Sequence, residues 1–129
     1  SVLTGGNWRG NRCEPTILTD VTPQMTIFRE ETFGPVTCVY RVASPDEALR
    51  LANDSEFGLS GSVYTPDLSL ALKFVEELNV GMVHVNGTTI QDEPHVPFGG
   101  VGASGPGRES TDTDVDAMTE WKWATIQHS

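Results

Sequence analysis

The stretch Glu30-Glu31-Thr32-Phe33-Gly34-Pro35-Val36 organises the rest of the chain. Two acidic residues and an aromatic residue precede a Gly-Pro pair. This pair predicts a turn, because glycine takes backbone angles that other residues avoid and proline fixes φ. The β-branched run that begins at Val36 predicts a strand after the turn. A carboxylate and a ring held there suit a sugar hydroxyl and the flat face of a ring. The alternative is a solvated acidic turn whose Phe33 packs into the core.

Outward from this turn, the predicted elements alternate between strands and helices. Strands are expected at 15–21, 36–42, 58–64 and 82–85. Helices are expected to begin at Ser44-Pro45-Asp46-Glu47, which reads as a capping box, and after Thr65-Pro66-Asp67. In the second helix an apolar stripe recurs at helical spacing: Leu68, Ala71, Leu72, Val75 and Leu78. Helices that cross over between strands predict an α/β fold with a parallel βαβαβ sheet.

The connecting segments carry weaker signals. Residues 1–15 are expected to be an irregular entry, and 23–28 a connector with three buried side chains: Met25, Ile27 and Phe28. Gly81 suits a left-handed stop after the second helix. The stretch 109–116 is either a helix start or a solvated turn. Alternation of Trp121, Trp123 and Thr125 with Lys122, Ala124 and Ile126 predicts a terminal strand that must pair with something distant.

A second glycine-rich stretch is Pro97-Phe98-Gly99-Gly100-Val101-Gly102-Ala103-Ser104-Gly105-Pro106-Gly107-Arg108-Glu109. It contains G-x-G-x-x-G, but that fingerprint binds a dinucleotide only between a strand and a helix, and neither is expected here. Together with the first stretch it resembles the aldehyde dehydrogenase superfamily, whose C-terminal part carries E-E-x-F-G-P-V and later P-F-G-G-x-x-x-S-G-x-G-R-E. Shorter matches follow in the family's order: Ala52-Asn53, Phe57-Gly58-Leu59, Gly81 and Val85-Asn86. The resemblance covers nearly the whole chain.

Composition narrows the function further. The chain has 129 residues, a net charge of −10 and no apolar run near the length of a membrane span. Such acidity argues against binding to nucleic acid or an anionic membrane. The first six residues lack the pattern of a signal peptide, so a cytoplasmic location is expected.

Cysteines and histidines give no site of their own. Cys13 and Cys38 are open to three readings: a disulfide, a metal pair or a nucleophile. Reduced thiols are favoured, with Cys38 as a small core residue and Cys13 more open. The histidines lack metal-ligand spacing, so no metal is expected, and His84 is interpreted as a satisfied sheet residue.

The resemblance implies roles for individual residues. Glu31 matches the carboxylate that binds the nicotinamide-ribose hydroxyls of NAD or NADP, and Phe33 the ring beside the nicotinamide. Phe98 matches a ring of the substrate tunnel, and Thr88 to Val96 the loop that varies with substrate preference. Residues 85–93 and 125–127 look like the branch that acts on aromatic aldehydes such as benzaldehyde, vanillin or salicylaldehyde. Two positions depart from the family pattern: Gly102, where lysine is frequent, and Thr32, where an aliphatic residue is usual.

The family's catalytic cysteine, its glutamate base and its nucleotide-binding domain precede the E-E-x-F-G-P-V turn. Only 29 residues precede Glu30, and neither cysteine lies in the nucleophile's motif, so no catalytic residue is assigned. The resemblance therefore implies a C-terminal fragment of an aldehyde dehydrogenase, inactive alone. Residues 1–118 would be half of the catalytic domain and 119–129 an oligomerisation strand and tail of a homo-oligomer. The alternative is a non-catalytic α/β interaction module that assembles through the same strand.

Overall fold

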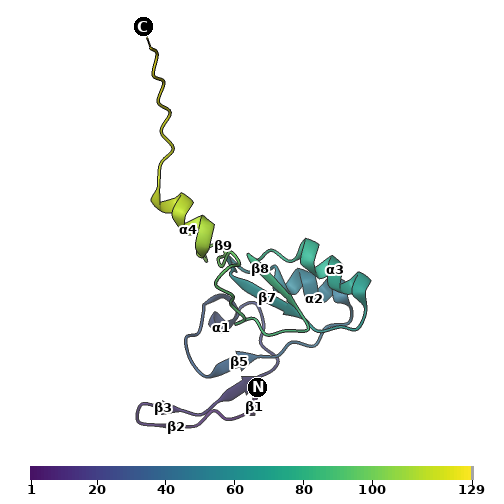
Figure 1. The fold of residues 1–129 in the computed structure, drawn as a ribbon. Coiled ribbons are helices and arrows are strands. Elements are labelled where there is room, and N and C mark those ends of the chain that lie inside the picture. Colours follow the sequence, from purple (N-terminus) through teal and green to yellow (C-terminus); the bar gives the residue numbers. More distant parts are fainter. Residues whose placement is uncertain (129) are drawn as a thin grey trace. The chain divides into compact units, whose positions relative to one another are not determined.

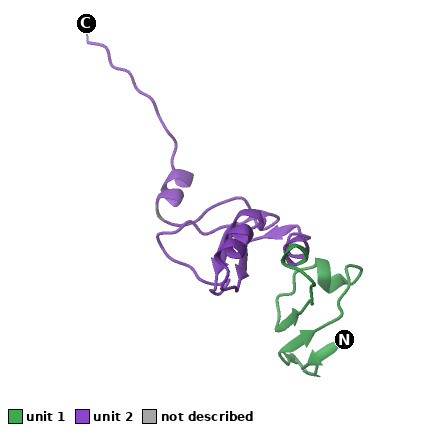
Figure 2. Cartoon of the chain, turned by 90° about the vertical axis from the view of Figure 1, so that its right-hand side faces the viewer, with its two compact units in different colours: residues 1–47 green, residues 48–129 purple. Residues whose placement is uncertain are grey.

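The computed structural model describes residues 1–128 and divides the chain into two compact units, Ser1–Glu47 and Ala48–Ser129 (Figure 2). Ser129, the last residue of the predicted tail, lies outside the described residues. Each unit contains a pair of parallel strands, so the predicted α/β class is confirmed. The parallel pairing is divided between two sheets, because the strand after the Gly-Pro turn pairs within the first unit.

The first unit is built around a three-stranded sheet in the order β1-β4-β5 (Figure 1). Its elements are β1 (Val2–Thr4), β2 (Trp8–Arg9), β3 (Arg12–Cys13), β4 (Thr16–Leu18), α1 (Thr26–Arg29) and β5 (Val36–Cys38). β4 lies in the centre, antiparallel to β1 and parallel to β5. Its first residue, Thr16, is paired with Val36, so the strand after the Gly-Pro turn begins level with β4.

The expectation of an irregular entry at 1–15 was wrong. β2 and β3 form an antiparallel hairpin in which Arg9 is paired with Arg12. The two residues between them are Gly10, with φ of 59°, and Asn11. Gly-Asn between two short runs is a hairpin signal in its own right, because a tight hairpin turn needs positive φ. That signal was present in the sequence and was overlooked.

Two further expectations for the first unit need correction. The connector at 23–28 contains the one-turn helix α1, and Met25 is 44% exposed rather than buried. Phe28 is half-buried and meets the ring of Tyr40 edge-on at 5.8 Å. The strand predicted at 36–42 ends at Cys38, because its partner β4 ends at Leu18 and Asp20 then takes a left-handed φ of 55°.

The second unit contains the predicted β-α-β crossover. Its strands are β6 (Phe57–Gly58), β7 (Ser60–Val63), β8 (Met82–Val85) and β9 (Val101–Gly102), and its helices are α3 (Leu68–Glu77) and α4 (Thr111–Met118). α2 (Pro45–Ala52) spans the boundary between the units. β7 and β8 pair in parallel, and α3 packs against β8 (Figure 1). The strand predicted at 58–64 is divided at Leu59, because β6 pairs with β9 instead.

Both predicted helix starts are confirmed. Glu47 donates its backbone N–H to Ser44 Oγ at 3.2 Å, and its carboxylate accepts from the N–H of Ala43 at 2.7 Å. Asp67 accepts from the N–H groups of Ser69 and Leu70 at 2.8 and 3.3 Å, satisfying two donors that a helix N-terminus leaves free.

The buried core of the described residues is small. Its hydrophobic members are Leu49, Val63, Ala71 and Leu78. Two of these belong to the apolar stripe predicted for α3, but Leu68, Leu72 and Val75 of the same stripe are exposed. A helix that exposes three residues of its apolar stripe has surface available for a partner segment.

Two asparagines link the elements of the second unit through the backbone. Asn53 donates to the carbonyl of Glu77 and accepts from the N–H of Asn79, both at 2.8 Å. Asn86 donates to the carbonyl of Thr65 at 3.0 Å and accepts from its N–H at 2.8 Å. Each side-chain amide thus satisfies one backbone N–H and one backbone carbonyl that would otherwise lack a hydrogen-bond partner in a helix or strand.

The end of the chain differs from the prediction. Of the stretch 109–116, left open between a helix start and a turn, residues 111–116 lie in α4 and Ser110 is its N-cap. Residues 119–128 form no strand, since they have no strand partner within the part of the chain that the structure describes. Within this segment Trp123 Nε1 donates to Thr125 Oγ1 at 2.9 Å.

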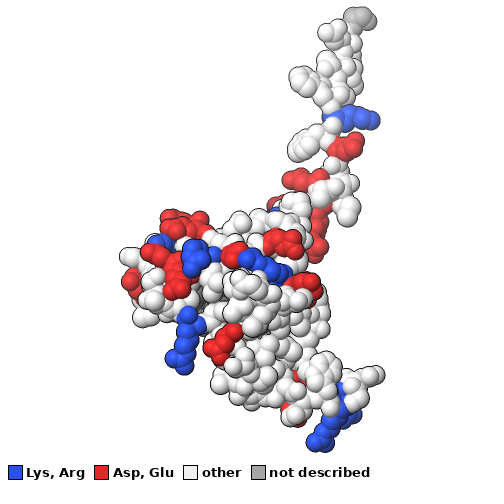
Figure 3. All heavy atoms as spheres, turned by 180° about the vertical axis from the view of Figure 1, so that it is seen from behind, with Lys and Arg blue, Asp and Glu red and all other residues white. Residues whose placement is uncertain are grey.

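No helix formed by residues 1–128 has both the length and the apolarity needed to cross a bilayer. On the face drawn in Figure 3, lysine and arginine side chains are scattered among acidic ones rather than gathered into one basic patch. That distribution agrees with the net charge of −10.

Candidate functional site

The acidic turn of the first unit presents its side chains to solvent. Phe33 is 94% exposed, so the alternative in which it packs into the core does not hold for the described chain. Glu31 is exposed and makes no hydrogen bond or ion pair with any of residues 1–128. The two side chains lie two residues apart on the same turn and are both free to contact a ligand.

Hydrogen bonds at the end of this turn tie it to the sheet. Pro35 accepts from the N–H of Thr16 at 2.8 Å, and Val36 donates to the carbonyl of Gly34 at 2.8 Å. Gly34 is not among the glycines with positive φ, so the left-handed freedom expected of it is not used. The turn therefore owes its position to strand pairing and to Pro35.

A cavity of about 340 Å³ lies beside the turn in the same unit. Its lining comprises Thr4, Pro15, Thr16, Ile17, Gly34, Pro35, Val36 and Thr37. None of these side chains carries a charge. The charges of the turn are therefore those of Glu30 and Glu31, which are not among the residues that line the cavity.

The two cysteines are not paired with each other. Both are free thiols, and both are half-buried. Burial raises the pKa of Tyr40, and the neighbouring Cys38 adds to the effect through a hydrogen bond and through charge. Among the described residues, no group of histidine, cysteine and acidic side chains is placed to hold a metal ion.

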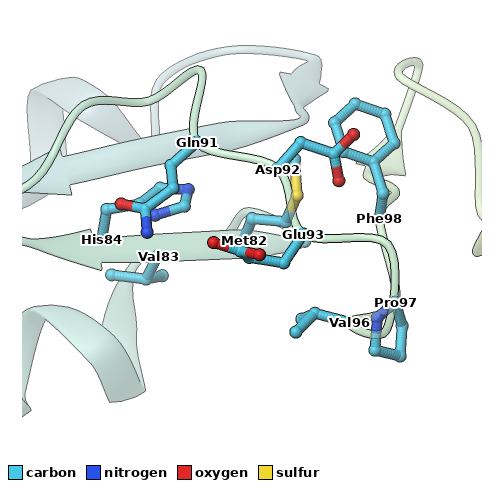
Figure 4. A pocket seen from close by; sticks show the side chains of 10 residues that line it. Met82, Val83, His84, Gln91, Asp92, Glu93, Val96, Pro97 and Phe98 are labelled. Atoms are coloured by element: carbon cyan, nitrogen blue, oxygen red, sulfur yellow. The ribbon is translucent and has the colours of Figure 1, made fainter. Parts of the chain in front are cut away.

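The second unit contains a pocket of about 350 Å³ between β8 and the loop that follows it (Figure 4). β8 and the residue before it contribute Gly81, Met82, Val83 and His84, and the loop contributes Gln91, Asp92, Glu93, Val96, Pro97 and Phe98. Phe98, predicted to line the substrate tunnel, is part of this wall. Four of the loop positions lie within the segment 88–96 that was expected to govern substrate preference.

Sequence reasoning missed His84. It was interpreted as a satisfied sheet residue, but its Nε2 is buried and has no hydrogen-bond partner in the described chain. In the parallel pairing it lies opposite Ser62, whose hydroxyl donates instead to the carbonyl of Gly87 at 2.6 Å. One sequence signal could have drawn attention to His84. Side chains alternate along a strand, so Met82 and His84 are expected on the same face of β8.

The glycine-rich loop supports the wall that carries Phe98. Phe98 exchanges two backbone hydrogen bonds with Glu109, at 2.9 and 2.7 Å. Arg108 donates to the carbonyl of Gly100 at 2.6 Å, and Ser104 accepts from the N–H of Gly58 at 3.0 Å. These hydrogen bonds tie the loop to Phe98 and to β6, and the two-residue strand β9 lies within its G-x-G-x-x-G run.

Gly102, one of the two departures from the family pattern, has a structural reason in this chain. Its φ is 58°, and an added Cβ would lie 2.5 Å from the carbonyl oxygen of Glu56. A residue with a side chain would be strained here. Thr32, the other departure, is exposed, and nothing in the structure explains why threonine stands there.

The structure describes the predicted site residues in two separate units. Glu31 and Phe33 lie together on the turn of the first unit, and Phe98 lies in the pocket of the second. Glu31 and Phe33 are therefore neighbours within the first unit, and Phe98 is described only within the second.

Comparison with known proteins identifies a family that matches most of the chain. The model of the aldehyde dehydrogenase family matches residues 1–124. Among curated relatives, the benzaldehyde dehydrogenase YfmT of Bacillus subtilis is 46% identical over 95% of this chain and 25% of its own length. The NADP-dependent succinate-semialdehyde dehydrogenase of Deinococcus radiodurans is 48% identical over 95% of this chain and 26% of its own.

A solved structure shows the same fold. The salicylaldehyde dehydrogenase of Pseudomonas putida G7, complexed with salicylaldehyde, matches with a TM-score of 0.92 and 42% identity over 99% of this chain and 26% of that chain. This chain spans about a quarter of the length of the curated relatives it matches. On the family match and the shared fold, the chain belongs to the aldehyde dehydrogenase family.

Proposed function

We propose that this chain acts as the C-terminal quarter of an NAD(P)-dependent aldehyde dehydrogenase that oxidises an aldehyde to a carboxylic acid. The observation that carries the proposal is the pair Glu31 and Phe33, an unpartnered carboxylate and an exposed ring on a turn fixed to a sheet. Phe33 is 94% exposed, so its ring is available to a ligand that approaches the turn.

The residues present fit a nicotinamide cofactor. Glu31 is an acceptor-only group that binds two neighbouring ribose hydroxyls, and the flat ring of Phe33 suits the nicotinamide face. When bound, the cofactor supplies the hydride acceptor for oxidation of the aldehyde. What this chain contributes is orientation, since a carboxylate on a fixed turn holds the ribose at a constant distance from the sheet.

The pocket of the second unit is proposed as part of the aldehyde site. Its lining combines five apolar side chains with four polar ones, which suits a small-molecule site: Met82, Val83, Val96, Pro97 and Phe98, with His84, Gln91, Asp92 and Glu93. The proposed substrates are aromatic aldehydes, in line with the benzaldehyde and salicylaldehyde dehydrogenases to which the chain is similar.

The nucleophilic cysteine, the glutamate base and the nucleotide-binding domain are proposed to come from sequence outside this chain. Cys13 and Cys38 belong to the first unit, and neither is among the ten residues that line the pocket of the second unit. The chain by itself is therefore expected to oxidise no aldehyde.

A chimera tests the proposal. Residues 1–129 of this chain replace the matching quarter of the YfmT benzaldehyde dehydrogenase, and NAD(P)H formation with benzaldehyde is followed by absorbance. We expect turnover within about tenfold of the parent enzyme, because the motifs that touch cofactor and substrate are retained. The isolated chain serves as the inactive control. A soluble, folded chimera without turnover on any aldehyde would contradict the proposal.

The end of the chain favours a second role, in assembly. Trp121 and Trp123 are 98% and 92% exposed on an extended segment, and large exposed rings next to unpaired backbone suit pairing with another chain. We propose that 119–127 adds as a strand to a sheet of a second subunit.

Assembly through this segment predicts a change in mass. Trp121→Lys in the chimera should lower the oligomeric mass measured by light scattering, because a charge would enter the subunit interface. Trp8→Lys is the matched control, since Trp8 is also exposed but lies on the hairpin of the first unit. An unchanged mass for Trp121→Lys would rule out this role for the segment.

A further inference from the structure

We infer that Ser110 is a positioning residue for the pocket of the second unit: its hydroxyl holds the loop 91–98 in place and thereby sets the affinity of the site for an aldehyde. This inference rests on the proposed function and adds to it a residue that does not itself line the pocket. The backbone of Ser110, the direction of its hydroxyl, the second attachment of the loop and the exposure of the loop all support this role.

Ser110 has a backbone conformation that suits glycine better than serine. Its φ is 102° and its ψ is 134°, a combination that residues with a side chain rarely adopt. Both backbone polar groups of Ser110 are engaged. Its N–H donates to Asp114 Oδ2 at 2.9 Å, and its carbonyl accepts from the N–H and Oγ1 of Thr113 at 3.2 and 2.5 Å. Strained residues persist where their surroundings fix them and gather at functional sites, so the role of the side chain is informative.

The hydroxyl of Ser110 does not cap the helix that it precedes. Serine at an N-cap usually accepts a hydrogen bond from a backbone N–H of the first helical turn. Ser110 is the N-cap of α4, but its side chain makes no such bond. Its hydroxyl donates instead to the carbonyl of Pro94, sixteen residues earlier in the chain. The side chain therefore serves the loop beside the pocket and not the helix.

Two adjacent residues attach this loop at two points. Glu109 exchanges backbone hydrogen bonds with Phe98 at 2.9 and 2.7 Å, and Ser110 binds Pro94. The apolar end of the pocket is formed by residues 96–98 (Figure 4), so it follows the first attachment along the chain and ends at the second. The two contacts thus hold the apolar end of the pocket from both sides.

Few other contacts hold the loop. Residues 91–97 are all exposed, so burial contributes little to their position. Within the part of the chain that the structure describes, the hydrogen bonds of 91–98 to other segments are those with Ser110 and Glu109. The bond from the N–H of Val96 to the carbonyl of Glu93, at 3.0 Å, lies inside the loop. Without the Ser110 hydroxyl, an aldehyde would have to order the pocket wall as it binds, at a cost in affinity.

The test replaces Ser110 in the chimera. Ser110→Ala removes the hydroxyl and keeps a side chain at positive φ, whereas Ser110→Gly removes the hydroxyl and also relieves the backbone. We expect both variants to raise the KM for benzaldehyde by about three- to tenfold, as expected for the loss of one hydrogen bond. The values of kcat and of the cofactor KM should stay within about twofold of the parent chimera. Thermal unfolding should show Ser110→Gly to be more stable than Ser110→Ala, a difference that the aldehyde KM does not follow.

Ser55→Ala is the matched control. The Ser55 hydroxyl accepts from the N–H of Phe57 at 3.1 Å, in an exposed turn of the same unit that does not line the pocket. Its loss should leave the benzaldehyde KM unchanged. Hydrogen exchange adds a readout that requires no turnover: the amide of Val96 should exchange faster in Ser110→Ala than in the parent chimera or in Ser55→Ala.

The outcomes separate this inference from the proposed function. A benzaldehyde KM within about twofold of the parent in both Ser110 variants would overturn the inference and leave the proposed function intact. A KM that Ser110→Gly restores would also overturn it, because strain and not the hydroxyl would then govern the site. Unchanged exchange of the Val96 amide in Ser110→Ala would overturn the inference alone. A folded chimera that oxidises no aldehyde would overturn both.

Discussion

Replacing Gly81 with alanine is expected to lower the free energy of unfolding of this chain by about 3 kcal/mol or more. An added Cβ would lie 1.9 Å from the carbonyl oxygen of Gly99, 2.7 Å from its carbonyl carbon and 2.8 Å from Cα of Gly100. All three are backbone atoms, so no side-chain rotation relieves the overlap and a backbone segment must move.

The cost of this substitution extends to the pocket. Gly81 precedes β8 and is one of the lining residues, and its N–H donates to the carbonyl of Gly58 at 2.9 Å. Gly99 directly follows Phe98, so displacing Gly99 displaces the apolar end of the pocket as well. A chimera carrying Gly81→Ala should therefore lose aldehyde affinity together with stability.

Gly107→Ala is the matched control, since an added Cβ there meets no atom within 4 Å. Urea unfolding of the chain, followed by circular dichroism, should move by less than about 0.5 kcal/mol for Gly107→Ala. Equal stability of Gly81→Ala and the unmodified chain would show that the two glycine segments are not in contact.

The same glycine shows where sequence reasoning fell short. A left-handed helix stop was expected at Gly81, but its φ is not positive, and α3 ends at Glu77, after which Leu78 is extended. Glycine is needed here because two backbones approach each other, and the partner, Gly99, lies in a distant part of the sequence. Helix-end rules describe local geometry only, so a close approach between distant segments is invisible to them.

Local signals predicted local structure well. The caps Ser44 and Asp67 form the expected hydrogen bonds, and the β7-α3-β8 crossover has the expected parallel pairing. Boundaries that depend on a distant partner were less accurate. β5 stops where β4 stops, and residues 119–128 form no strand because pairing requires a neighbour that the described chain does not supply.

The candidate site was predicted unevenly for a similar reason. Glu31, Phe33 and Phe98 followed from motif resemblance and lie on an exposed turn and in a pocket. Asp92 lies within the segment 88–96, which the resemblance also indicated. His84 was missed, because a strand residue and the loop that lines the same pocket become neighbours only when the chain folds back. Burial of His84 Nε2 without a partner is a property of the packed structure, and no spacing in the sequence encodes it.

Replacing Glu31 with alanine is expected to raise the dissociation constant of the nicotinamide cofactor by about tenfold to a hundredfold, measured in the chimera. A hydrogen bond to a charged group contributes about 1.5–3 kcal/mol, and a carboxylate accepts from two vicinal hydroxyls at once. Glu31 has no other partner among residues 1–128, so its removal leaves no protein group unpaired and the loss reports on the ligand alone.

Three variants separate charge from position. Glu31→Gln keeps one acceptor oxygen, so its effect should be smaller than that of Glu31→Ala. Glu30→Gln is the matched control, because it removes a charge from the adjacent residue, whose side chain is also exposed. Phe33→Leu removes the flat ring and should lower kcat more than it raises the cofactor dissociation constant, since the ring orients the nicotinamide.

The measurement combines cofactor fluorescence titration with steady-state kinetics. Titration reports binding without turnover, so a loss in Glu31→Ala is not confused with damage to the aldehyde pocket. Kinetics at saturating cofactor then show whether orientation is lost as well as affinity. If Glu30→Gln weakens cofactor binding as much as Glu31→Ala does, general electrostatics accounts for the effect. Unchanged titration and turnover in Glu31→Ala would remove the turn from the cofactor site, whatever the aldehyde selectivity of the second unit proves to be.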